Sequence, residues 1–207
     1  MNRTFLIFLM IGTAMMITVI GQHEEASQLD TMPWEVDRLE NGSLRVFGIT
    51  LGKTSIQEAN QLFARFGENQ FQVKTGNNDK PEFELYTLYD ELAFGGLIAS
   101  LKLNYQIDQK DLELIYQSLT TDQRASGANT FSIDKDTQIK YLSSPVSSVT
   151  YIPSIDYDPQ TIRQNFGQPT AEKQVDDELQ IWSYAKMGLQ IYIYKTQADQ
   201  FIYTPLK

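Results

Sequence analysis

Residues 158–195 carry the clearest structural signals of this chain, and they read DPQTIRQNFGQPTAEKQVDDELQIWSYAKMGLQIYIYK. Asp158 can cap the N-terminus of a helix, and Pro159 suits the first helical position because its missing N–H would have no partner there. Gly167 can end the helix, and Pro169 prevents its continuation. The first part of the stretch therefore predicts one short, capped helix.

The second part of the same stretch predicts two strands, over 179–185 and 189–195, joined by a turn. An earlier segment has a related order: residues 48–67 read GITLGKTSIQEANQLFARFG and end in Phe66-Gly67, as the second helix ends in Phe166-Gly167. Strand-like runs follow at 83–89 and 98–107. We therefore expect an internal duplication of a helix followed by an antiparallel meander.

Four short motifs mark the second unit, in the order Thr161-Ile162, Phe166-Gly167-Gln168-Pro169, Trp182-x-Tyr184 and Gly188-Leu189. This pattern resembles the SmpA/OmlA (BamE-like) domain, a small lipoprotein of the outer-membrane barrel-assembly machinery. A tandem pair of such units is similar to the fold of the beta-lactamase-inhibitor protein. The resemblance implies a binding scaffold, with helices packed on antiparallel sheet.

The expected class is α+β, with two helix-plus-meander repeats in a two-layer packing after an N-terminal hydrophobic leader. We divide the chain into a signal peptide or membrane anchor (1–21), a tether (22–43), a first repeat (44–153) and a second repeat (154–207). Asn41-Gly42-Ser43 is interpreted as a turn at the end of the tether.

The first repeat begins with a strand expected over 44–49 and a helix that starts near residue 55. Ser55 and Glu58 have the spacing of a capping box. The apolar stripe expected to be buried on this helix consists of Ile56, Ala59, Leu62, Phe63 and Phe66. Further along, we expect a strand at 71–75, a helix capped by Asp108, a loop at 121–129, strands at 137–143 and 147–152, and a last strand at 199–206.

The N-terminus carries a targeting signal. Arg3 is followed by residues 5–20, an uncharged apolar run of 16 residues. As a helix this run spans about 24 Å, less than the roughly 30 Å of a bilayer core. The length favours a signal peptide, and an uncleaved anchor is the alternative. We expect a periplasmic or secreted body, or one anchored to the inner membrane by residues 5–20.

Composition excludes several classes of function. The 207 residues include 17 basic and 26 acidic side chains, a net charge of −9 that disfavours nucleic acid as a partner. There is no Cys, which removes disulfides, zinc–thiolate sites and thiol catalysis. The single His, His23, lies in the tether, so no Ser–His nucleophile system is expected in the folded body.

Two motifs suggest a ligand-binding or catalytic site, but each is better interpreted as a turn. Residues 48–54 suggest a phosphate-binding loop, but only three residues separate Gly48 from the Gly52-Lys53 pair where the motif needs four. Residues 176–178 form an acidic cluster, yet consecutive strand residues point to opposite faces and give no opposed carboxylate pair. A weak calcium site is conceivable there, and a solvated turn is the favoured interpretation. We expect no catalytic residues, no metal and no cofactor.

Aromatic residues on the two predicted strands are the feature that indicates a binding function. Trp182 and Tyr184 share one face of their strand, and Tyr192 and Tyr194 share one face of the next. Facing outward, they would be candidate protein-binding residues; the alternative is cross-strand pairing within the fold. The expected function is non-catalytic binding of another envelope protein, as a scaffold or inhibitor-like module. The alternatives are an accessory factor in envelope assembly or stress, and a carboxylate-dependent hydrolase.

Overall fold

A computed structural model describes residues 28–76, 80–125 and 127–206. The fold is mixed and rich in strands, and it is built around one large sheet. Nine strands of this sheet run in the order β10 (Ala171–Gln174), β11 (Leu179–Tyr184), β12 (Leu189–Tyr194), β13 (Gln200–Tyr203), β9 (Val146–Pro153), β7 (Leu97–Tyr105), β6 (Pro81–Phe94), β5 (Glu68–Thr75) and β8 (Thr130–Ser132). The two-residue strand β1 (Gln28–Leu29) pairs in parallel with β6.

The remaining elements are helices and a small second sheet. The described helices are α2 (Ile56–Leu62), α3 (Gln109–Ser118), α4 (Thr121–Ala125), α5 (Lys135–Tyr141), α6 (Pro159–Phe166) and the 3₁₀ turn η2 (Ala185–Met187). The small sheet contains β2 (Asp37–Arg38), β3 (Leu44–Val46) and β4 (Ile49–Thr50).

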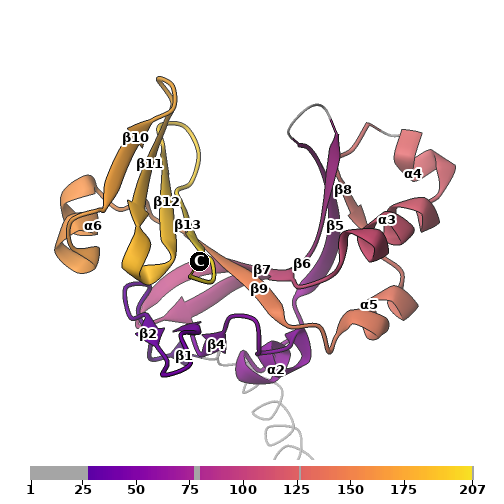
Figure 1. The fold of residues 1–207 in the computed structure, drawn as a ribbon, viewed down its shortest axis with the longest axis horizontal. Coiled ribbons are helices and arrows are strands. Elements are labelled where there is room, and N and C mark those ends of the chain that lie inside the picture. The colour runs from indigo at the N-terminus through magenta and orange to yellow at the C-terminus, as the bar shows by residue number, and fades with distance from the viewer. Residues whose placement is uncertain (1–27, 77–79, 126, 207) are drawn as a thin grey trace, which may run out of the picture.

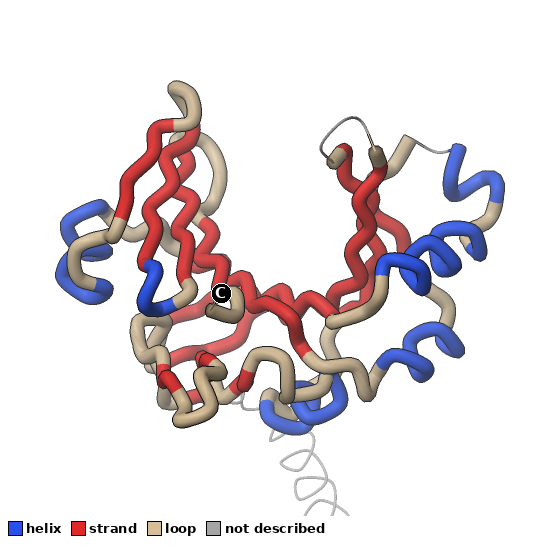
Figure 2. The backbone as a smooth tube through the Cα atoms, viewed as in Figure 1, coloured by secondary structure: helices blue, strands red, loops and turns tan. Residues whose placement is uncertain are grey.

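The large sheet is bent into a trough with two raised arms (Figure 1). One arm carries β10–β13 and the other carries β5, β8 and the first part of β6, while β7 and β9 form the floor between them. Helix α6 lies outside the first arm, α3 to α5 lie outside the second, and α2 with the small sheet lies beneath the floor. No described helix covers the inner side of the trough, which is lined mainly by the strands of the large sheet (Figure 2). We call this inner side the concave face.

Both predicted repeats contribute to this one sheet. Strand β13 pairs antiparallel with β9, with Phe201 opposite Tyr151. Strand β9 then pairs antiparallel with β7, with Tyr151 opposite Leu101. Because this ladder crosses the predicted boundary at residue 154, the two halves share backbone hydrogen bonds and a core.

The two short helices form for the reasons that the sequence indicates. Asp158 accepts hydrogen bonds from the backbone N–H groups of Gln160 and Thr161, at 2.9 and 3.0 Å, and α6 ends at Gly167. In α2 the capping box is present, because Ser55 and Glu58 each accept from the other's backbone N–H. Each cap satisfies donors that the first turn of a helix leaves without partners.

Aromatic rings form the core beneath the floor of the trough. Phe47 is buried in the two-residue turn between β3 and β4 with φ 51°, a value unusual for a residue with a side chain. Its ring lies 4.6 Å from Phe94, 5.3 Å from Tyr151 and 5.9 Å from Tyr203, measured between centroids. This packing offsets the backbone strain and ties the small sheet to the large one.

The predicted stripe of the first helix is only partly correct. Ile56, Ala59 and Phe63 are buried, but Leu62 is 36% exposed and Phe66 is 86% exposed. Helix α2 ends at Leu62, and Ala64 adopts φ 50°. The chain therefore turns before Phe66 can complete the helical spacing.

Other element predictions also need correction. Residues 137–143, predicted as a strand, belong largely to α5, whose N-cap Asp134 accepts from the N–H of Thr137. The expected loop at 121–129 contains α4, and the expected strand at 44–49 is the hairpin β3–β4. Strands β8 and β10 were not predicted.

The segment predicted as a tether is packed against the body from residue 28 onward. Pro33 is buried, and its carbonyl oxygen accepts a hydrogen bond from the buried hydroxyl of Tyr203. The predicted leader and His23 lie outside the described residues. Within the described ranges, no helix combines the length and apolar character that a membrane crossing requires.

Candidate functional site

The concave face is built from alternate residues of neighbouring strands in the large sheet. In β7, Lys102 and Asn104 face the trough, while Leu101, Leu103 and Tyr105 are buried on the opposite side. The cross-strand register extends this face, since Lys102 lies opposite both Leu88 of β6 and Thr150 of β9. The strand predicted over 98–107 is therefore confirmed, and its alternating side chains separate a polar inner side from an apolar outer side.

A charged cluster lies on the β5–β6–β7 part of the concave face. Glu84 accepts from the Nζ atoms of Lys74 at 2.7 Å and Lys102 at 3.0 Å. Lys102 also donates to Gln72 at 3.2 Å, and its Nζ lies 4.1 Å from the ring centroid of Tyr86. These contacts hold the cluster in one arrangement before any partner arrives.

Burial and charge oppose each other in this cluster. Burial raises the pKa of Glu84, but the hydrogen bonds and charges of Lys74 and Lys102 outweigh it, so the pKa lies below its ordinary value. For Lys102, burial dominates over the attraction of Glu84 and lowers the pKa. Glu84 pairs with two lysines, so this cluster carries one positive charge in excess at neutral pH.

A groove of about 610 Å³ runs over the centre of this face. Side chains from β5, β6, β7, β9 and β13 line it, among them Ile152 and Ile202. The side-chain oxygen of Asn104 is buried in the groove and has no hydrogen-bond partner among the described residues. Such an acceptor is normally satisfied, so it offers a position for a donor from a bound molecule or water.

The four predicted aromatic residues do not share one surface. Tyr192 and Tyr194 are half-buried on the concave side of the β12 arm, with ring centroids 6.5 Å apart. Trp182 and Tyr184 are 1% and 4% exposed, so the structure excludes them from the surface. Trp182 lies opposite Ile191, and Tyr184 lies opposite Leu189, on the apolar side.

Helix α6 explains the burial of the two excluded rings. The guanidinium of Arg163 lies 4.0 Å from the ring centroid of Trp182. The hydroxyl of Tyr184 donates to the carbonyl of Gly167 at 3.3 Å, and its ring packs against Phe166. Both rings therefore fix the helix on the sheet and take no part in the concave face.

The residues 48–54 form an ordinary turn and do not form a phosphate cradle. The N–H of Gly52 donates to Val146 at 2.8 Å, and the N–H groups of Lys53 and Thr54 donate to Thr50 at 3.1 and 2.9 Å. Because these donors are used within the fold, they cannot wrap an anion. The hydrogen bonds and the spacing of the motif therefore lead to the same conclusion, that residues 48–54 are not a phosphate-binding loop.

The acidic residues 176–178 form the turn between β10 and β11. Asp176 accepts from the N–H groups of Glu178 and Leu179, at 2.8 and 2.9 Å. This is the local hydrogen bonding that makes Asp frequent in turns. Among the described residues, no group of three or more acidic or His side chains could hold a metal ion.

One carboxyl group lies on the buried side near the β12–β13 connection. Asp199 is 2% exposed and accepts from the N–H of Tyr194 at 3.0 Å. Its own N–H donates to Asp156 at 3.4 Å. Burial, helped by the charge of Asp156, raises the pKa of Asp199 to about 6. Sequence reasoning did not single it out, because neither periodicity nor motif distinguishes a buried Asp from an exposed one.

Models of known protein families, curated proteins and solved structures were each compared with this chain, and none of the three comparisons found a match.

Proposed function

We propose that this protein binds another protein of the cell envelope through its concave face and catalyses no reaction. The observation that carries the proposal is the shape and composition of that face: a trough of sheet that no described helix covers, with half-buried Tyr192 and Tyr194 on one arm. Tyrosines of this kind supply much of the binding energy in protein interfaces.

The composition of the trough supports a protein partner. Glu84 pairs with both Lys102 and Lys74, and Ile152 and Ile202 add apolar surface between these polar neighbours. Protein interfaces combine an apolar centre with a polar rim in the same way. The curvature favours a protruding loop or hairpin of the partner.

The arrangement of the two halves supports a further part of the proposal, that they are diverged copies of one BamE-like module. In each half a short, capped helix precedes an antiparallel meander: α2 precedes β5 to β7, and α6 precedes β10 to β13. Together with the N-terminal apolar run, this favours export and a periplasmic body, either released or held at the inner membrane by residues 5–20.

Site-specific photocrosslinking in cells tests the binding proposal on the full chain. A benzophenone amino acid would replace Tyr192 or Ile202 on the concave face. Matched controls would carry it at Leu114 or Ile139, which are 50% and 56% exposed on α3 and α5. We expect one discrete adduct from the concave positions only. Equal adducts from both faces, or none from the trough, would contradict the proposal.

A further inference from the structure

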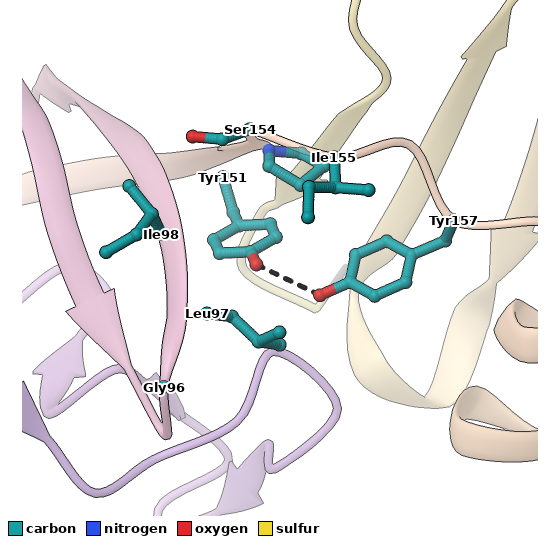
Figure 3. A pocket seen from close by; sticks show the side chains of 8 residues that line it. Gly96, Leu97, Ile98, Tyr151, Ser154, Ile155 and Tyr157 are labelled. Atoms are coloured by element: carbon teal, nitrogen blue, oxygen red, sulfur yellow. Dashed lines mark hydrogen bonds between the residues drawn. The ribbon is translucent and has the colours of Figure 1, made fainter.

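A separate pocket of about 310 Å³ lies at the end of the sheet, where β7 begins and β9 ends (Figure 3). Leu97 and Ile98 line it from β7, Tyr151 lines it from β9, and Ile155 and Tyr157 line it from the loop that leads to α6. This pocket shares no lining residue with the groove of the concave face. It is therefore a second candidate site, independent of the proposed protein-binding surface.

The pocket has the size and lining of a small-molecule site. Its volume falls at the lower end of the roughly 300–1,000 Å³ that such sites occupy, and its walls are mainly apolar. Ile155 is 77% exposed and Ile98 is 46% exposed, so large aliphatic side chains meet water at this site. Covering them with an apolar molecule would remove that surface from water.

Two tyrosine hydroxyls supply the polar group of the pocket. The oxygens of Tyr151 and Tyr157 lie 3.1 Å apart, and Leu97 and Ile155 flank them from opposite sides (Figure 3). Each hydroxyl has one proton, so the shared hydrogen bond uses one and leaves the other. No other described group bonds to either hydroxyl. Tyr151 is 0% exposed and Tyr157 is half-buried, so the hydroxyl that a ligand oxygen can reach is that of Tyr157.

The rings that carry these hydroxyls are held in place. Tyr151 stacks on Phe47 with centroids 5.3 Å apart, and Tyr157 packs edge-on against Phe201 at 5.6 Å. The polar group is therefore preorganised, and a ligand would not have to order it.

Charge selects against anions at this pocket. None of its lining residues is charged, so no Lys or Arg is present to pair with a carboxylate or phosphate. Asp156 lies in the same loop, between Ile155 and Tyr157, and adds a negative charge nearby. An unpaired anion would lose its hydration without compensation.

We infer that this pocket binds a small, uncharged, mainly apolar molecule that carries one hydrogen-bonding oxygen, which bonds to the hydroxyl of Tyr157 that Tyr151 holds in place. The apolar body of the ligand would lie between Leu97 and Ile155, with its oxygen at Tyr157.

Photolabelling of the full chain tests this inference with a matched pair of probes. The neutral probe is a benzyl alcohol that carries a trifluoromethyl diazirine in the para position, and the charged probe is the corresponding benzoic acid. We expect the alcohol to label peptides that contain residues 96–98 and 151–157. The benzoate should label them at least about tenfold less, because the pocket cannot pair its charge.

Substitutions locate the site and its polar group. Leu97→Trp and, independently, the exposed Ile155→Trp should fill the pocket and abolish labelling of these peptides, whereas Leu114→Trp on α3 should leave it unchanged. Tyr157→Phe should weaken labelling by the alcohol by about two- to tenfold, as expected for one lost hydrogen bond. Unchanged labelling in both filled variants, or equal labelling by alcohol and benzoate, would overturn the inference.

Discussion

The two faces of the large sheet use the same strands for opposite purposes. On the outer face, Trp182, Tyr151 and Leu103 are buried beneath helices and the small sheet. On the concave face, their neighbours Ile181, Ile152 and Lys102 are only half-buried, and no described helix covers them. The difference indicates that the outer face carries the stability of the fold, while the concave face is free to carry recognition.

Replacing one buried ring should give the largest effect. Trp182→Ala removes a ring that is 1% exposed and contacts Arg163, so we expect a loss of about 3–5 kcal/mol in the free energy of unfolding. Urea denaturation measures this. The control is Ile181→Ala, one residue away on the concave side, with an expected loss of about 1 kcal/mol. Equal losses would remove the distinction between the faces.

Partner binding should depend on the opposite face. Tyr192→Ala combined with Tyr194→Ala should weaken binding to the crosslinked partner by about 2–4 kcal/mol, as for interface hot spots. Titration calorimetry with the identified partner measures this, and Leu114→Ala is the control. The free energy of unfolding should fall by about 1.5–3 kcal/mol in the double variant, because each ring is only half-buried. A protein that no longer folds would instead place these tyrosines among the core residues.

Asp199 is an ionisable group on the buried side, and it predicts a pH dependence. Its pKa is raised to about 6 in the folded state, above the value of about 3.9 expected in the unfolded chain. The folded state therefore binds the proton more tightly. Stability from this group is fully present below about pH 4 and is lost as pH rises through about 6.

The substitution Asp199→Asn keeps an oxygen for the N–H of Tyr194 and removes the buried charge. It should stabilise the protein by about 2–3 kcal/mol at about pH 8, and by much less at about pH 4. Urea denaturation at the two pH values measures the difference. The same effect of the substitution at both pH values would show that ionisation of Asp199 is not its cause.

The smallest effect is expected at the rim of the concave face. Lys74 is 42% exposed, so Lys74→Ala should change the free energy of unfolding by about 0.5 kcal/mol or less. Lys102 is 17% exposed and lies over the ring of Tyr86, so Lys102→Ala should cost more, about 1–2 kcal/mol. Denaturation of both variants in low and high salt distinguishes charge from packing. A larger loss of stability in Lys74→Ala than in Lys102→Ala would contradict the prediction that Lys102 is the more tightly packed of the two lysines.

Local signals predicted much of the secondary structure. The caps of α6 and α2 involve residues close in sequence, so Asp158, Ser55 and Glu58 could be recognised directly. The prediction of an element was wrong where two sequence patterns competed. Residues 137–143 contain β-branched and aromatic side chains that favour a strand, but the cap at Asp134 and the packing of Tyr141 favour helix α5.

The candidate sites were harder to predict than the elements. Period-two alternation shows which residues share one face of a strand, but the register between strands determines which faces meet. The ladder that sets Trp182 opposite Ile191 buries the tryptophan and leaves Tyr192, opposite Ile181, on the concave side. The apolar pocket brings together residues 97 and 155, and no pattern in the sequence predicts that two residues so far apart along the chain lie side by side.

Composition and residues a few positions apart were enough to predict a mixed helix-and-strand class, the capped helices α2 and α6, and the absence of thiol chemistry. The pairing of distant strands was needed to show that one bent sheet joins both halves, that the tyrosines divide between core and surface, and that a carboxyl group is buried at Asp199. Those outcomes depend on long-range pairing, in which many weak contacts between distant residues must be satisfied together.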